Sequence, residues 1–163
     1  MSDALLARPA VRRVTEFLTS MNAASSVIVL AETARTAEDA ANSLNCELGA
    51  IVKSLVFRVG EQPVMALVAG DKRCDTKALP AALGLSGKAK RADADMVQAA
   101  TGFTIGGVAP VGFPAPLPLV IDASLDRFDA IYAAAGHPHC VFATTLAELA
   151  RLTGGVVDAG IAE

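Results

Sequence analysis

Lys53 lies in a run of β-branched and aromatic residues, 51–57, that predicts a β-strand. Side chains of a strand alternate between its two faces, so Lys53 shares the more apolar face with Ile51, Leu55 and Phe57. Burying an unpaired cation is costly. The ammonium group must therefore reach an edge of the sheet, meet an anionic partner or line a pocket. An ordinary edge lysine and a ligand anchor are both consistent with this pattern.

A second candidate is the segment Gly106-Gly107-Val108-Ala109-Pro110. Adjacent glycines let backbone N–H groups approach a ligand closely, and a proline stiffens the loop that carries them. Such a loop can bind a carbonyl or another small polar group through main-chain donors. A tight structural turn is the alternative interpretation of the same residues.

Other chemical signatures are weak. The run His137-Pro138-His139-Cys140 offers three ligand types, but no second cluster completes a tetrahedral metal site. Gly87-Lys88 is followed by Ala89, so it does not match a phosphate-binding loop. Only two histidines are present, and their spacing supports no catalytic triad. We therefore predict neither a metal nor a cofactor.

Composition indicates one globular domain, residues 1–163, with 53% hydrophobic and 19% charged residues. The three cysteines are isolated and the N-terminus does not resemble a signal peptide, so we expect a cytoplasmic protein. Segment 96–121 is uncharged, but its glycines and prolines argue against a membrane span. We expect no membrane association, and irregular buried or pocket-lining structure in this segment.

The net charge of −3 gives no global sign of nucleic-acid binding, and we expect no DNA partner. Basic residues nevertheless outnumber acidic ones between positions 71 and 91. Lys72, Arg73 and Lys88 of this stretch are candidate nucleic-acid contacts. A solvated surface without a binding role explains the same charges equally well.

Periodicity and capping signals predict helices interspersed with short strands. The predicted helices span 9–22, 36–44, 75–84, 93–102 and 145–153, and the predicted strands span 26–30, 51–57, 64–69, 88–91, 117–121, 130–132 and 140–142. Strand 64–69 is apolar on both faces, so the sheet should be covered on both sides. We predict the α+β class, with a mixed, barrel-like sheet surrounded by helices.

Three segments together carry a resemblance: 49–57 around Lys53, the 106–110 loop and Gly136-His137-Pro138. In type, order and spacing they resemble the YbaK/ProX family of trans-editing aminoacyl-tRNA deacylases, which is related to the editing domain of bacterial prolyl-tRNA synthetases. The resemblance runs from about residue 11 to residue 155. It implies the fold of that editing domain.

The resemblance also implies roles. Lys53 matches the family's essential strand lysine, which contacts the terminal adenosine end of the tRNA or helps to hold the scissile ester. Gly106 and Pro110 match the ends of the G-x-x-x-P loop, whose backbone binds the aminoacyl carbonyl. His137 falls where alanine-specific branches carry a histidine that shapes the amino-acid pocket. Residues 139–142 depart from those branches, so the cognate amino acid is open.

The resemblance leads us to expect hydrolysis, in trans, of a small amino acid such as Ala, Cys or Ser from mischarged tRNA, most plausibly tRNA-Pro. The expected partners are aminoacyl-tRNA and a prolyl-tRNA synthetase. A non-catalytic module that binds tRNA 3′ ends or aminoacyl groups is the alternative. A hydrolase of another small acyl ester is a third reading.

Overall fold

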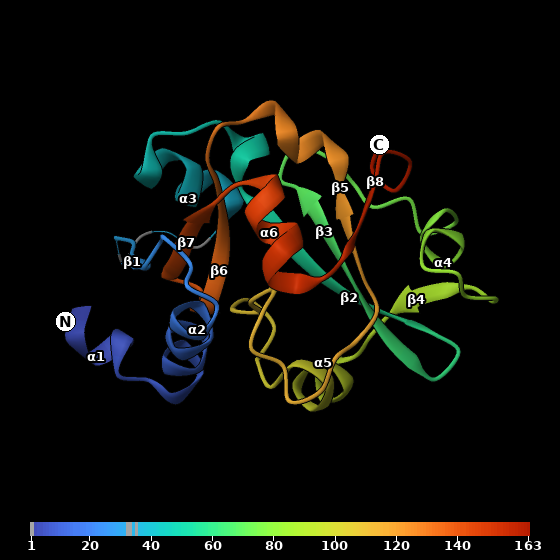
Figure 1. Cartoon of the computed structure of the whole chain (residues 1–163), viewed down its shortest axis with the longest axis horizontal. Coiled ribbons are helices and arrows are strands. Elements are labelled where there is room, and N and C mark those ends of the chain that lie inside the picture. Colours follow the sequence, from blue (N-terminus) through green and yellow to red (C-terminus); the bar gives the residue numbers. More distant parts are fainter. Residues whose placement is uncertain (1, 32–33, 35) are drawn as a thin grey trace.

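The computed structural model describes residues 2–31, 34 and 36–163 (Figure 1). Within them, a three-stranded antiparallel sheet has the order β1–β7–β6, and a mixed five-stranded sheet has the order β4–β2–β3–β5–β8. The strands are β1 (Val27–Val29), β2 (Val52–Val59), β3 (Gln62–Ala69), β4 (Ala89–Arg91), β5 (Leu119–Asp122), β6 (Ile131–His137), β7 (Cys140–Thr144) and β8 (Val156–Asp158). The helices are α1 (Ser2–Leu6), α2 (Pro9–Ser20), α3 (Ala37–Leu44), α4 (Leu79–Ala82), α5 (Ala94–Thr101) and α6 (Leu146–Thr153), with 3-10 turns η1 (Leu48–Ala50) and η2 (Ala123–Arg127).

The predicted α+β class is confirmed, but the two sheets do not close into a barrel. In the described residues they meet at one parallel bridge, between Ile51 and Tyr132. On its outer edge β2 pairs with β4 only from Phe57 to Val59. Among the described residues, no strand lies beside the stretch of β2 between these contacts on that side, and we call this stretch the free edge of β2.

The five-stranded sheet is covered on both faces, as the apolar residues on both sides of strand 64–69 predicted. Every residue of β3 from Val64 to Ala69 is buried. One face joins the main core between the two sheets, to which α2, α5 and α6 contribute. The other face packs against α4 and the C-terminal segment around Ile161.

Three helices begin at the residues that the sequence predicted. The side chains of Thr36, Asp93 and Thr145 each accept a hydrogen bond from the backbone N–H three residues on, at 3.0, 2.8 and 3.1 Å. Such bonds satisfy N–H groups that have no partner within the helix. Thr145 and Glu148 have the spacing of a capping box, but Glu148 accepts hydrogen bonds from Arg151 instead of from the backbone of Thr145.

The helix predicted from 75 to 84 is wrong in length, since α4 covers only Leu79–Ala82. Asp75 does not cap it. Its carboxylate accepts the N–H groups of Lys77 and Ala78 in a local turn, and Pro80 removes a donor in the first turn of α4. The strand expected at 130–132 extends to His137, and α1, η2 and β8 were not predicted.

The uncharged segment expected to be irregular has neither helix nor strand between the end of α5 and β5. None of the described helices is long and apolar enough to cross a membrane. Gly107 of this segment packs directly on the turn between β6 and β7. A Cβ atom at Gly107 would lie 2.9 Å from the backbone N and Cα of His137. Two of the three segments that carry the resemblance, the 106–110 loop and 136–138, are therefore in contact.

The close approach of Gly107 makes a stability prediction. Gly107→Ala should lower the free energy of unfolding by about 1–3 kcal/mol, since the added methyl group must push apart two backbone segments. Urea denaturation measures this change. Gly160→Ala is the control, because the nearest atom there is a side-chain oxygen at 3.2 Å in an exposed turn. Equal unfolding midpoints for the two variants would show that the 107–137 contact is not tight.

Candidate functional site

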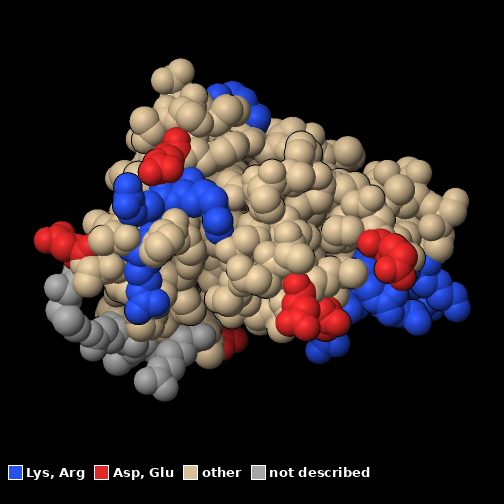
Figure 2. Space-filling view, turned by 90° about the horizontal axis from the view of Figure 1, so that it is seen from below, with Lys and Arg blue, Asp and Glu red and all other residues tan. Residues whose placement is uncertain are grey.

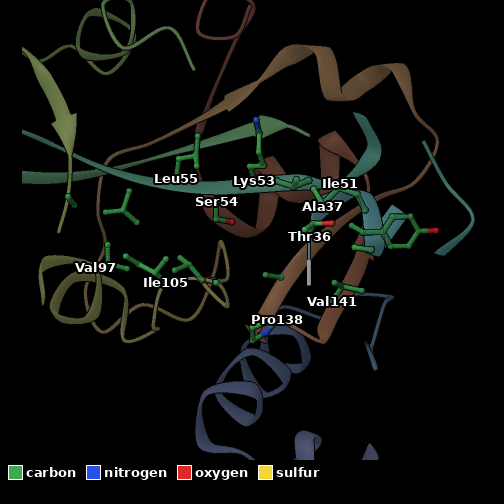
Figure 3. A pocket seen from close by; sticks show the side chains of 18 of the residues that line it. Thr36, Ala37, Ile51, Lys53, Ser54, Leu55, Val97, Ile105, Pro138 and Val141 are labelled. Carbon is green, nitrogen blue, oxygen red and sulfur yellow. The ribbon is translucent and has the colours of Figure 1, made fainter. Parts of the chain in front are cut away.

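A cavity of about 300 Å³ lies along the free edge of β2 (Figure 3). Its walls come from α3, β2, the end of β4, α5, the 105–108 loop, β6 and β7. Several wall residues are small: Ala37, Ala40, Ala92, Gly106 and Ala134. The cavity exists because β4 and β6 leave the middle of β2 uncovered.

Ser54 is a cavity residue that the sequence reasoning passed over. Its side chain leaves β2 on the side where Val97, Ile105 and Pro138 lie (Figure 3). Its hydroxyl oxygen is buried and has no hydrogen-bond partner among the described residues. A buried polar atom without a partner is costly, and such atoms mark sites where a ligand or water binds. The available signal was its position beside Lys53, on the alternate face of the strand.

The backbone of Ser54 also faces the cavity. The carbonyl of Val56 points to the outer edge of β2, where it accepts the N–H of Ala92 at 3.2 Å. Backbone groups of alternate residues in a strand point to the same edge. Ser54 therefore presents its own N–H and C=O groups at the free edge.

Lys53 lines the cavity, but its side chain leaves β2 on the face opposite to that of Ser54 (Figure 3). The half-buried ammonium group donates a hydrogen bond to the backbone carbonyl of Lys72. Burial lowers the pKa of Lys53 from its usual value, and the positive charges of Arg73 and Arg91 lower it further. Asp71 acts in the opposite direction. The cation thus sits at the rim, held by a carbonyl group and close to a carboxylate.

The 106–110 loop divides into two parts. Gly106 and Val108 line the cavity, and the left-handed φ of +102° at Gly106 favours glycine there. Gly107, Ala109 and Pro110 are buried behind the wall. Ile105 projects beside them and is 63% exposed as a residue, which is unusual for a large apolar residue lining a cavity.

His137 supports the wall from behind, and its neighbour Pro138 lines the cavity in its place. The Nδ1 atom of His137 accepts the N–H of His139 at 3.1 Å. This bond requires an unprotonated Nδ1. Burial lowers the pKa of His137, and the charges of Arg8 and His139 add to this effect. The geometry gives His137 a role in shaping the β6–β7 turn.

The predicted basic residues do not form one compact cluster. Lys72 and Arg73 follow β3 beside the ammonium group of Lys53, whereas Lys88 precedes β4 near Val59 at the other end of β2. At about 3.3 Å per residue, these two positions are roughly 20 Å apart. In Figure 2, Lys and Arg side chains gather at both ends of the molecule, one group on the side of α1 and α2 and the other at the end with β4 and the β2–β3 hairpin, each with acidic side chains beside it.

The sulfur and imidazole groups do not assemble a further centre. Cys46, Cys74 and Cys140 are free thiols. Burial raises the pKa of Cys74 to about 11, which keeps it protonated near neutral pH. Over 2–31, 34 and 36–163, no three His, Cys, Asp or Glu side chains are placed to hold a metal ion.

Comparison with known proteins shows which family this chain resembles. The family model described as "Aminoacyl-tRNA editing domain" matches residues 31–152. The Bacillus subtilis (strain 168) protein YwhH is 31% identical over 87% of this chain and 90% of its own length. The Enterococcus faecalis protein named "Putative Cys-tRNA(Pro)/Cys-tRNA(Cys) deacylase EbsC" is 30% identical over 72% of this chain and 77% of its own length.

Among solved structures, one titled as that of "a putative trans-editing enzyme for prolyl tRNA synthetase" superimposes with a TM-score of 0.86. It is 38% identical to this chain, and the match covers 93% of this chain and 96% of the other. The family model, the relatives and the structure agree with the YbaK/ProX resemblance carried by the three sequence segments. The chain belongs to the aminoacyl-tRNA editing domain family.

Proposed function

We propose that this protein removes a small amino acid, such as Ala, Cys or Ser, from mischarged tRNA-Pro. It acts in trans in the cytoplasm, alongside a prolyl-tRNA synthetase. The observation that carries the proposal is the cavity of about 300 Å³ at the free edge of β2. The names of the relatives, which refer to tRNA(Pro) and to prolyl tRNA synthetase, support the choice of tRNA.

The cavity wall supports a small substrate side chain. Four alanines place backbone close to the cavity: Ala37 and Ala40 on α3, Ala92 after β4 and Ala134 on β6. Val97 and Val108 add apolar surface. A wall of this kind accepts a short side chain and excludes a longer one by steric overlap.

Hydrolysis of an aminoacyl ester does not need a dedicated acid or base side chain, because this ester is already activated. The protein needs to hold the ester, admit a water molecule and stabilise the developing oxyanion. The N–H groups of Ser54, Gly106 and Val108 are the donors that we assign to the carbonyl, since the N–H of Gly107 already donates to the carbonyl of Thr104 at 3.1 Å. In this arrangement the ester lies across the free edge of β2. The amino acid lies on the face of β2 that carries the Ser54 side chain, and the tRNA end lies on the face that carries Lys53.

Lys53 provides the charge for this arrangement. On the other face of β2, its ammonium group anchors the anionic 3′ end of the tRNA as a point charge. The described cavity wall contains no Asp, Glu or His. That observation favours the runner-up, a module that binds the aminoacyl end without hydrolysing it, and the first experiment separates the two.

Single-turnover deacylation over a panel of mischarged tRNAs tests the role of Lys53. Lys53→Ala should slow hydrolysis about 100-fold or more, as when another fixed electrostatic group of an active site is removed. Lys53→Arg should retain part of the rate if the residue is an anchor, and none if it is a base. Because burial lowers the pKa of Lys53, the wild-type rate should fall as pH rises through that lowered pKa.

In Lys53→Arg this fall should be absent, since arginine stays charged. Lys77→Ala is the matched control, because Lys77 is an exposed lysine outside the cavity wall. A wild-type protein that binds these tRNAs and hydrolyses none of them establishes the binding module. Hydrolysis at the wild-type rate in Lys53→Ala removes Lys53 from the site.

Ser54→Ala separates substrate binding from folding. Loss of a hydrogen bond to the substrate should lower kcat/KM about tenfold, since 1.4 kcal/mol corresponds to a factor of ten. The free energy of unfolding should stay equal or rise, because the buried hydroxyl has no hydrogen-bond partner among the residues that the structure describes. Ser86→Ala, at an exposed serine, is the control. A destabilised Ser54→Ala variant with normal kcat/KM would contradict the assignment.

Charge reversal tests the tRNA contacts proposed for Lys72, Arg73 and Lys88. Reversing all three should weaken tRNA binding and flatten its salt dependence, by about 0.7 in the log–log slope for each lost contact to a single strand. Fluorescence titration over a range of salt concentrations measures this slope. Reversal of Arg12 on α2 checks for a general effect of net charge. An unchanged slope would show that these residues form an ordinary solvated surface without a role in tRNA binding.

A further inference from the structure

The partner of the Lys53 ammonium group is a backbone carbonyl in a surface turn. Lys72 supplies this carbonyl, and its own N–H donates to the carbonyl of Ala69 at 3.0 Å. A main-chain acceptor in a turn is only as well placed as the turn itself. The position of Lys53 therefore depends on whatever fixes residues 69–73.

An ion pair fixes the middle of this turn. Two guanidinium nitrogens of Arg127 donate to the two carboxylate oxygens of Asp71 at 2.8 and 2.9 Å. The third, Nε, donates to the carbonyl of Ser124 at 2.7 Å, and the guanidinium lies 4.8 Å above the ring of Phe128. A bidentate pair fixes orientation as well as distance. It joins the turn to η2.

Two further contacts hold the same turn, one against η1 at the start of β2 and one against the end of β5. At Gly49 in η1, a Cβ atom would lie 2.8 Å from Phe128 and 2.9 Å from the Asp71 carboxylate, so the pair stacks directly on the chain that leads into Lys53. The N–H of Ala69 donates to the buried carboxylate of Asp122 at 3.0 Å. The turn is thus held at its start and at its centre, and at its end the backbone groups of Arg73 exchange two hydrogen bonds with Glu163, at 3.0 and 2.9 Å.

We propose that the Asp71–Arg127 ion pair positions Lys53 by holding the turn that supplies the Lys72 carbonyl. This inference rests on the proposed role of Lys53 in deacylation. The side chain of Arg127 is 41% exposed and that of Asp71 is 37% exposed. Exposed ion pairs contribute about 0–1 kcal/mol to stability. The pair therefore serves the site more than the stability of the fold.

Because of the charges around Lys53, the two ways of breaking the ion pair should shift the pKa of Lys53 in opposite directions. Asp71, Arg73, Cys74 and Arg91 are the titratable groups that act on its ammonium. Arg127 keeps the pKa of Asp71 below its usual value, mainly through the side-chain hydrogen bonds, so Asp71 is ionised near neutral pH. Removing Arg127 leaves the Asp71 charge unopposed, whereas neutralising Asp71 removes an attraction for the Lys53 cation.

The experiment measures the pKa of Lys53 by NMR with 13Cε-labelled lysine, using Lys53→Arg to assign the resonance. Arg127→Gln should raise this pKa and Asp71→Asn should lower it, although both substitutions break the same pair. Misplacement of the ammonium should also lower single-turnover kcat about 10- to 100-fold in each variant. Arg127→Lys keeps the charge but not the bidentate geometry, so it should restore the pKa and only part of kcat.

Arg151→Gln is the matched control, because Arg151 donates to Glu148 with nearly the same bidentate geometry on α6, at 2.7 and 2.8 Å. It should leave kcat and the pKa of Lys53 unchanged. Shifts of the Lys53 pKa in the same direction in Arg127→Gln and Asp71→Asn, or no shift in either, overturn the proposal. The NMR measurement needs no tRNA. An inactive wild-type protein would thus reject the deacylase function separately from the positioning role.

Discussion

The free edge of β2 is the constraint on which the site depends. Had β4 continued along β2 past Phe57, or β6 past Ile51, the backbone groups around Ser54 would have been used in a sheet. Leaving a strand edge unpaired usually carries a risk of unwanted association. Here α3, α5 and the 105–108 loop surround that edge and turn it into a cavity wall. The incomplete closure of the sheets is therefore what provides room for a substrate.

Strand geometry divides the site between two faces. Neighbouring residues of β2 must point in opposite directions, so Lys53 and Ser54 cannot enter the same part of the cavity. The charged group lies with the 69–73 turn, and the hydroxyl lies with the apolar wall. A substrate with a polyanionic end and a small acyl group matches this division. In the proposed function, substrate binding follows from the strand geometry of β2 as much as from any single side chain.

Local signals in the sequence predicted much of the fold. The caps at Thr36, Asp93 and Thr145 and the two-sided burial of β3 are local properties, and they were correctly anticipated. The position of Lys53 on a strand was also predictable. Its carbonyl partner was not, since Lys72 reaches it only through the β2–β3 hairpin and a further turn. Asp71 and Arg127 lie far apart in the chain, and no local pattern marks that pair.

The alanines of the cavity wall have an evolutionary consequence. Ala37, Ala92 and Ala134 stand on or beside different elements, each fixed by its own packing. Adding one or two carbon atoms at any of them would narrow the cavity locally without moving the other walls. One methylene in such a wall changes discrimination by about 10- to 200-fold. Under the proposed function, the substrate preference of such a wall changes from one small amino acid to another in single mutational steps, while the backbone groups at the free edge of β2 stay the same.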